Sequence, residues 1–223
     1  MLLHPGEIEA TGWRVEKLVD VLGSLADVSP DVSGRPRIIA IDGRGGAGKT
    51  TLVQRLQAFL PMSAVVHTDD IAWNEAFFEW ADLLIDNVLR PLHRGQSVAF
   101  RPPAWIEHDR PGAICVPAGA DVVWIEGTGI IRDVIVDWLD ASIWIQGDLA
   151  QQERRLAARD GDTVAQQQHI VNWLAEELPL LLHERPWAKA TLVVAGTTQL
   201  DHNPDIEIVV APPTAPWTRT QGN

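Results

Sequence analysis

Cysteine, tyrosine and long apolar runs are scarce or missing in this chain. Cys115 is the single cysteine, so no disulfide can form within the chain, and we interpret it as a small core residue. No tyrosine is present that could act as a general acid or stack on a ligand. No apolar run approaches the roughly 18 residues of a membrane span, and the first residues show no signal-peptide pattern. These absences predict a cytoplasmic protein without a membrane partner.

Positive charge is sparse as well. The chain has 18 lysines and arginines against 30 aspartates and glutamates, which gives a formal net charge of −12. Such a surface repels polyanions, so the charge balance argues against nucleic acid as a partner. Only three residues are lysines, namely Lys17, Lys49 and Lys189, and Lys49 follows a run of glycines. Because lysines are so few, a lysine directly after the glycines indicates a specific role for Lys49.

The size and composition suit one α/β domain with a full core. The chain has 223 residues, of which 46% are hydrophobic and 22% are charged. We expect a helix over residues 7–27 and then a linker, which together occupy residues 1–36. The main domain would span residues 37–212, and a flexible tail residues 213–223. The N-terminal helix is expected to be a packing element or a contact in a possible homodimer.

Short apolar runs alternate with helical patterns in the main domain. This alternation predicts a parallel, doubly wound sheet of five strands flanked by helices. Residues 206–210 are expected to add an edge strand, and a long helix over 163–178 should kink or end at Pro179. In such a sheet, ligands bind beyond the carboxyl ends of the strands. The five runs are residues 37–42, 64–67, 122–126, 142–146 and 191–194.

A glycine-rich loop between the first predicted strand and the helix behind it is the most informative segment. It matches the phosphate-binding pattern GxxxxGK(S/T) at every fixed position. The predicted strand before it and the predicted helix after it lie where this motif requires them, which strengthens the assignment. Glycines let successive N–H groups turn toward phosphate oxygens, and the helix start adds a positive dipole end. Lys49 would contact the β- and γ-phosphates, and the Thr50 hydroxyl would bind Mg²⁺. The loop therefore predicts ATP and Mg²⁺ as cofactors. Its members are Gly43, Arg44, Gly45, Gly46, Ala47, Gly48, Lys49, Thr50 and Thr51.

Two aspartates, Asp69 and Asp70, follow the second predicted strand. Phosphoryl transfer to a hydroxyl needs a carboxylate that orients the hydroxyl and accepts its proton. We assign Asp69 as the catalytic base and a candidate metal ligand, and Asp70 as a supporting, substrate-binding residue. Which of the two is the base stays open. The alternative is that the pair caps a helix that begins near Asn74.

Glu126 ends an otherwise apolar run on the same predicted edge of the sheet. An acid at this point can reach Mg²⁺ directly or through water. Together, Thr50, Glu126 and Asp69 form the predicted magnesium site. The alternative for Glu126 is a strand-end glutamate in solvent. His67 and His169 have no metal-like spacing, and we expect core or surface roles for them.

Three arginines, Arg154, Arg155 and Arg159, lie in a predicted helix that begins near residue 148. Arg155 and Arg159 are four residues apart, so they share one face of the helix. Such a face can act as a lid, about residues 148–162, that neutralises charge on the transferring group. We therefore assign Arg155 and Arg159 as catalytic and Arg154 as nucleotide-binding. The alternative is a solvated charged face.

Residues 96–120 form a predicted insertion on the substrate side, with short strands at 97–100 and 113–116 around an irregular segment. An arginine can clamp a carboxylate or phosphate, and a tryptophan can stack on a ring. The alternative is a surface loop with a proline-rich turn. The candidate residues for binding a small-molecule acceptor are Arg101, Trp105, His108 and Arg110.

Taken in order, these motifs resemble the group of small-molecule kinases that includes uridine kinase, phosphoribulokinase, pantothenate kinase and nicotinamide riboside kinase. The resemblance implies a P-loop fold and ATP-dependent transfer of a phosphoryl group to a hydroxyl of a nucleoside or similar acceptor. It also implies that Asp69 is the catalytic acid. Gly196-Thr197 is similar to the adenine-side loop of these kinases, which adds Thr197 to the nucleotide-binding candidates. The matching pieces are residues 43–51, 67–70, 125–127 and 154–160.

Two other functions are compatible with a phosphate-binding loop. A GTPase-like regulatory switch would be expected to carry an Asn-Lys-x-Asp guanine loop, and none of the three lysines lies in one. A degenerate protein that binds nucleotide without catalysis would not need the intact set of Lys49, Thr50, Asp69 and Glu126. The sequence favours a kinase and leaves the acceptor open.

Overall fold

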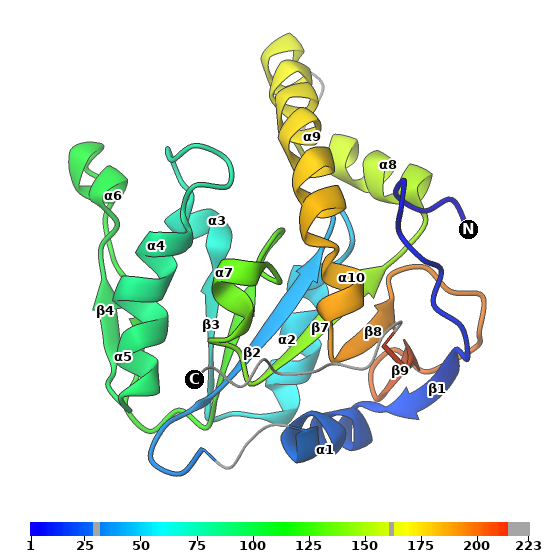
Figure 1. Ribbon diagram of the computed structural model, residues 1–223, viewed down its shortest axis with the longest axis horizontal. Coiled ribbons are helices and arrows are strands. Elements are labelled where there is room, and N and C mark those ends of the chain that lie inside the picture. Colours follow the sequence, from blue (N-terminus) through cyan, green and yellow to red (C-terminus); the bar gives the residue numbers. More distant parts are fainter. Residues whose placement is uncertain (29–31, 161–162, 214–223) are drawn as a thin grey trace.

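The computed structural model describes residues 1–28, 32–160 and 163–213. A seven-stranded sheet runs through the centre of the molecule, with helices on both of its faces (Figure 1). Its strand order is β1-β9-β8-β7-β2-β6-β3. The strands are β1 (Arg14–Lys17), β2 (Arg37–Gly43), β3 (Ser63–His67), β6 (Val122–Glu126), β7 (Ala141–Gln146), β8 (Leu192–Ala195) and β9 (Glu207–Ala211).

The five predicted strands form the parallel part of this sheet. β8, β7, β2, β6 and β3 are parallel neighbours, which confirms the predicted α/β architecture. The central strands are buried on both faces, which explains why they appear as continuous apolar runs in the sequence. β9 is the strand that was predicted near residues 206–210, and it pairs antiparallel with β8. It was expected at the edge of the sheet, but β1 pairs with its other side.

Two apolar cores lie on the two faces of the sheet. One is built with α1 and α2, and the other with α4, η1, α5, α7, the end of α9 and α10. None of the described helices combines the length and apolarity that crossing a bilayer requires. The helices are α1 (Leu18–Val28), α2 (Lys49–Phe59), α3 (Thr68–Ile71), α4 (Ala81–Leu84), the π-helical η1 (Ile85–Leu89), α5 (Arg90–His93), α6 (Pro103–Glu107), α7 (Asp133–Val136), α8 (Leu149–Asp160), α9 (Val164–Glu184) and α10 (Pro186–Lys189).

The N-terminal part differs from its prediction. Helix α1 begins at Leu18 and not at residue 7, because residues 14–17 form β1 and pair with β9. Gly12, with φ of 74°, precedes this strand in a backbone conformation that a helix does not contain. The helical spacing of Val15 and Leu18 is therefore overridden by pairing with a distant strand.

The long helix that was expected to kink or end at Pro179 does not end there. α9 continues through Pro179 and ends at Glu184, where Arg185 takes a left-handed conformation. A proline removes one backbone donor, and burial of Leu181 against the core favours the continued helix.

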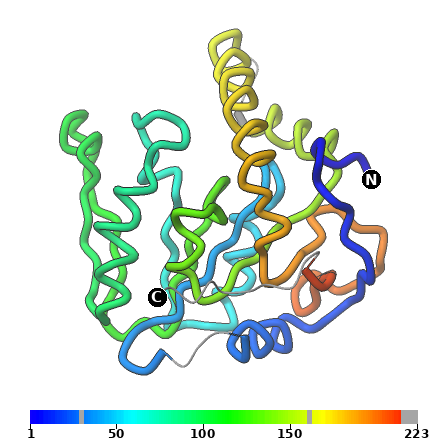
Figure 2. The backbone as a smooth tube through the Cα atoms, in the orientation of Figure 1, coloured from blue at the N-terminus to red at the C-terminus, as the bar shows by residue number. Residues whose placement is uncertain are grey.

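The predicted insertion forms a small unit of its own beside the main sheet. Its two predicted short strands are present as β4 (Val98–Phe100) and β5 (Ile114–Val116), which pair antiparallel, and the segment expected to be irregular contains α6. We call residues 98–116 the arm. Figure 2 shows the chain running out along the arm to α6 and back again on the left of the molecule.

Candidate phosphate-transfer site

The phosphate loop lies between the end of β2 and the start of α2, and Asp42 holds its first residue. Its Oδ1 accepts hydrogen bonds from the N–H groups of Gly43 (2.7 Å) and Gly129 (2.9 Å), and its Oδ2 accepts one from Ile131 (2.8 Å). Burial raises the pKa of Asp42 to about 6, although the three amides and Lys49 act in the opposite direction. Sequence reasoning missed this residue, although an acid in an otherwise apolar strand could have indicated it.

Lys49 lies over the loop and not out in solvent. Its Nζ donates to the carbonyls of Gly43 (2.9 Å) and Arg44 (3.1 Å) and to Thr128 Oγ1 (3.0 Å). The Thr128 hydroxyl in turn donates to the carbonyl of Gly43. These contacts hold the ammonium group at the mouth of the loop, where a polyphosphate would bind. Thr128 was also missed, although it lies in the glycine-flanked turn that ends β6.

Helix α8 packs closely on the loop. Gly46 has φ of 76°, and a Cβ at this position would lie 2.3 Å from the carbonyl oxygen of Gln152 in α8. Gly48, with φ of 99°, precedes the first turn of α2, which has no acidic residue and exposes Thr50 and Thr51. Gly46 and Gly48 are thus required by the local backbone, and the positive end of α2 is available to an anion.

A buried ion pair anchors the loop to α9. Glu177 Oε2 accepts hydrogen bonds from Arg44 Nε (3.3 Å) and Nη2 (3.2 Å), and its Oε1 accepts one from the N–H of Gly45 (3.0 Å). Ala47, in the same loop, is buried as well. No local pattern in the sequence marks Glu177, which lies 133 residues after Arg44.

Two of the three predicted metal residues, Thr50 and Glu126, lie side by side, whereas Asp69 lines the pocket described below. Thr50 Oγ1 lies 3.3 Å from Glu126 Oε2, and His67 Nδ1 lies 3.0 Å from Glu126 Oε1. Burial works to raise the pKa of Glu126, but His67, Lys49 and Thr50 outweigh it, so this pKa is lowered. The hydrogen bond with Glu126 raises the pKa of His67. We had not expected His67 beside this acid.

This arrangement fits magnesium better than a cation held by protein ligands alone. Among the described residues, no cluster of three or more histidine, cysteine, aspartate or glutamate side chains could hold a metal. Magnesium is usually held by one or two protein oxygens, waters and phosphate oxygens. The hydroxyl of Thr50 and the carboxylate of Glu126 provide such oxygens beside the phosphate loop.

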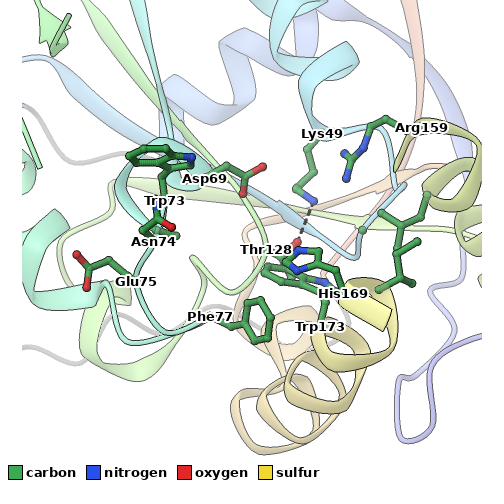
Figure 3. A pocket seen from close by; sticks show the side chains of 14 residues that line it. Lys49, Asp69, Trp73, Asn74, Glu75, Phe77, Thr128, Arg159, His169 and Trp173 are labelled. Atoms are coloured by element: carbon green, nitrogen blue, oxygen red, sulfur yellow. Dashed lines mark hydrogen bonds between the residues drawn. The ribbon is translucent and has the colours of Figure 1, made fainter. Parts of the chain in front are cut away.

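A pocket of about 510 Å³ opens beside the loop and collects several predicted residues (Figure 3). Asp69, Lys49 and Arg159 all line it, although they come from α3, α2 and α8. On the other side of the pocket, Phe77 packs edge-on against Trp173, with 5.4 Å between ring centroids. The remaining lining residues are Gly45, Ala72, Trp73, Asn74, Glu75, Thr128, Leu156, His169 and Ile170. Sequence reasoning missed the aromatic half because Phe77 and Trp173 are distant in the sequence, and it expected only a core or surface role for His169.

The three lid arginines have three different surroundings. Arg159 lines the pocket, whereas Arg155 donates to the carbonyl of Gly196 at 3.3 Å. Arg154 lines a second cavity together with Thr197. Arg155 and Arg159, which we assigned to one catalytic face, therefore have different surroundings.

The predicted acceptor residues of the arm cluster around Asp70. Arg110 forms an ion pair with Asp70, and its guanidinium lies 3.8 Å from the ring centroid of Trp105. Trp105 Nε1 donates to the carbonyl of Asp70 (2.8 Å), and Arg101 donates to the carbonyl of Arg110 (3.0 Å). The five predicted residues, Asp70, Arg101, Trp105, His108 and Arg110, are thus brought together, but none of them lines the pocket.

Trp73 connects this cluster to the pocket. It lines the pocket, its ring meets His108 edge-on with 5.6 Å between centroids, and the guanidinium of Arg110 lies 5.1 Å from its centroid. The arm therefore borders the pocket through one tryptophan. The role of its polar residues in substrate binding stays a prediction.

Comparisons with known proteins support the fold. Neither a protein-family model nor a curated protein matches the sequence. The structure of a possible uridine kinase from Bacillus stearothermophilus has 20% identity and a TM-score of 0.54, covering 79% of this chain and 96% of that one. A D-glycerate 3-kinase from Cryptococcus neoformans has 16% identity and a TM-score of 0.52, covering 83% of this chain and 96% of that one. The protein has the α/β fold of these P-loop kinases, as the resemblance in its motifs predicted.

Proposed function

We propose that the protein catalyses ATP-dependent transfer of a phosphoryl group to a hydroxyl of a small metabolite. The observation that carries this proposal is the pocket in which Lys49, Asp69 and Arg159 come together. A loop lysine, a carboxylate and a cationic lid residue are the groups that phosphoryl transfer needs around the reacting atoms.

Each side chain has a role in this proposal. The exposed carboxylate of Asp69 orients the acceptor hydroxyl and takes its proton as the new P–O bond forms and ADP leaves. Lys49 and Arg159 balance the negative charge on the transferring group. Thr50 and Glu126 would hold Mg²⁺, which neutralises phosphate charge when bound.

The aromatic half of the pocket supports an acceptor with a flat or apolar face. Phe77, Trp73 and Trp173 offer ring surfaces, whereas Asn74 and Glu75 offer hydrogen-bonding groups. A nucleoside or a similar hydroxylated ring compound combines these features. We further propose that Asp70 and the arm contact the end of the acceptor that lies farthest from Lys49.

The first experiment is a screen of nucleosides, vitamins and sugars for ADP release at fixed ATP and Mg²⁺. With the acceptor found, Asp69→Asn is expected to lower phosphorylation at least about a hundredfold, which is the scale of acid–base catalysis. ATP affinity should stay near that of the wild type, because Asn keeps the size of the side chain.

Asp70→Asn is the matched control, since it changes the neighbouring carboxylate, whose ion pair with Arg110 lies outside the pocket. Its phosphorylation rate should fall less than that of Asp69→Asn. Full turnover by Asp69→Asn would show that the base is wrongly assigned. Nucleotide binding without phosphorylation of any acceptor would favour a regulatory or non-catalytic nucleotide-binding protein.

A further inference from the structure

A second cavity, of about 920 Å³, lies near the carboxyl ends of β7 and β8. Three segments that are distant in the sequence line it. Gln151 and Arg154 come from α8, Thr197 comes from the segment after β8, and Glu9 and Trp13 come from the N-terminal segment, residues 1–13. The mechanism proposed above does not use this N-terminal wall.

The N-terminal segment is held firmly against the end of β7. The N–H of Leu2 donates to Asp148 (3.0 Å), and the carbonyl of Leu2 accepts from the N–H of Leu149 (2.8 Å). The N–H of Ala10 donates to the buried side chain of Gln146 (2.8 Å). Figure 1 shows this segment passing the start of α8 on its way to β1, which β9 holds by strand pairing. The wall is therefore a built part of the fold.

A further contact secures the middle of the segment. Glu7 Oε1 accepts hydrogen bonds from Trp144 Nε1 (2.6 Å) and Gln146 Nε2 (2.9 Å), both on β7. Trp13 itself is half-buried and packs against the apolar core. A ring held in this way loses little conformational freedom when a ligand stacks on it.

The order of the strands indicates what this cavity would hold. Asp69 follows β3 and Glu126 ends β6, which both lie on one side of β2, whereas β7 and β8 lie on the other side. A nucleotide whose terminal phosphate faces Asp69 must extend its nucleoside toward β7 and β8. The cavity adjoins the loop there, because a Cβ on Gly196 would lie 3.0 Å from the carbonyl oxygen of Ala47.

We propose that the N-terminal segment forms one wall of the nucleotide-base site and that Trp13 stacks on the base; this rests on the function proposed above. The indole supplies a flat apolar face, and the Arg154 guanidinium is a second planar group in the same cavity. Thr197 and Gln151, which are hydrogen-bonded to each other, present polar groups to the base edge. The carboxylate of Glu9 accepts a hydrogen bond from an exocyclic amino group of the base.

The test compares a nucleotide with the same phosphates lacking a base. Binding of the ATP analogue AMP-PNP and of tripolyphosphate, each with Mg²⁺, is measured by calorimetry. Trp13→Ala should weaken AMP-PNP about 5- to 150-fold, which is the range expected for loss of one stacked base. Its affinity for tripolyphosphate should stay within about twofold, whereas Trp13→Phe should keep most of the AMP-PNP affinity.

Trp138→Ala is the matched control. Trp138 is also half-buried, but it packs on His93 and Arg90, away from the lining of both cavities. This variant should bind both ligands as the wild type does. Equal AMP-PNP affinities of Trp13→Ala and Trp138→Ala would overturn the inference. An equal loss of AMP-PNP and tripolyphosphate in Trp13→Ala would also overturn it, because the effect would then not concern the base.

Two further results separate this inference from the proposed function. A wild-type protein that binds neither AMP-PNP nor tripolyphosphate overturns both. If Trp13→Ala does not fold, photolabelling of the wild type with 2-azido-ATP decides. An adduct mapped to the peptide that contains Trp13 supports the inference, and adducts found only elsewhere in a protein that phosphorylates its acceptor overturn the inference alone.

Discussion

Two arginine–carboxylate pairs lie near the pocket, and water reaches them to very different degrees. The side chains of Arg44 and Glu177 are 6% and 1% exposed, whereas those of Arg110 and Asp70 are 31% and 34% exposed. The first pair joins the phosphate loop to α9, and the second joins the arm to α3. An arginine–carboxylate ion pair therefore holds each side of the site to the fold, but one pair is buried and the other is partly exposed to water.

This difference separates a fixed side of the site from an adaptable side. Removing one partner of a buried pair leaves an uncompensated charge, which costs about 3–5 kcal/mol, whereas exposed pairs contribute about 0–1 kcal/mol. The phosphate loop cannot leave Glu177 without that loss. The arm can exchange its contact with Asp70 for a contact with a ligand at little cost, which suits a region that would meet an acceptor.

The largest effect is expected from Glu177→Ala. This substitution removes the acceptor of Arg44 and of the Gly45 N–H, so the free energy of unfolding should fall by about 3–5 kcal/mol. Urea unfolding followed by circular dichroism measures this change. Glu176→Ala, an exposed neighbour on α9, is the control and should stay within about 0.5 kcal/mol of the wild type. Similar losses in both variants would show that the effect does not come from the buried ion pair.

The second effect concerns pH and the other buried acid at the loop. Burial raises the pKa of Asp42 from 3.8 to about 6, so the folded state binds this proton more tightly than the unfolded state does. The contribution of Asp42 to stability is therefore highest in acid and decreases as the pH rises from about 4 to 6, by up to about 3 kcal/mol.

Asp42→Asn removes this titration while it keeps the size of the side chain. The free energy of unfolding of the wild type minus that of Asp42→Asn should decrease between pH 4 and pH 7 by up to about 3 kcal/mol. Urea unfolding of both proteins at several pH values measures the difference. Parallel curves over this range would show that Asp42 does not titrate there and that its carboxylate is already ionised in acid.

The phosphate loop on the fixed side of the site was predictable from the sequence, because its strand, turn and helix are consecutive. A strand, a glycine loop and a helix follow one another within residues 37–59, and their spacing alone predicts the turn that brings Lys49 over the loop. The parallel strands were recognisable because burial on both faces requires continuous apolar runs. Asp69 and Glu126 followed from the rule that ligands bind at the carboxyl ends of such strands.

The remaining features depend on contacts between distant segments. Glu177 lies on the long helix that was predicted from the sequence, but only the packing of α9 brings it to Arg44. The aromatic half of the pocket forms because Phe77 and Trp173 meet across 96 residues, from 77 to 173, which helical periodicity does not indicate. Residues 14–17 have a helical pattern, but the free backbone edge of β9 makes them a strand.

The smallest effect on stability is expected at the arm. Arg110→Ala removes the pair with Asp70 and the guanidinium contact with the Trp105 ring, and because the paired side chains are about one third exposed, the free energy of unfolding should fall by no more than about 2 kcal/mol. If the arm contacts the acceptor, the same substitution should raise the KM for the acceptor and leave the KM for ATP unchanged. A loss of stability as large as that of Glu177→Ala would break the contrast, because Arg110 would then fix the arm as firmly as Arg44 fixes the loop. A small loss of stability with an unchanged KM for the acceptor would show that the arm does not contact the acceptor, which would then bind in the aromatic pocket alone.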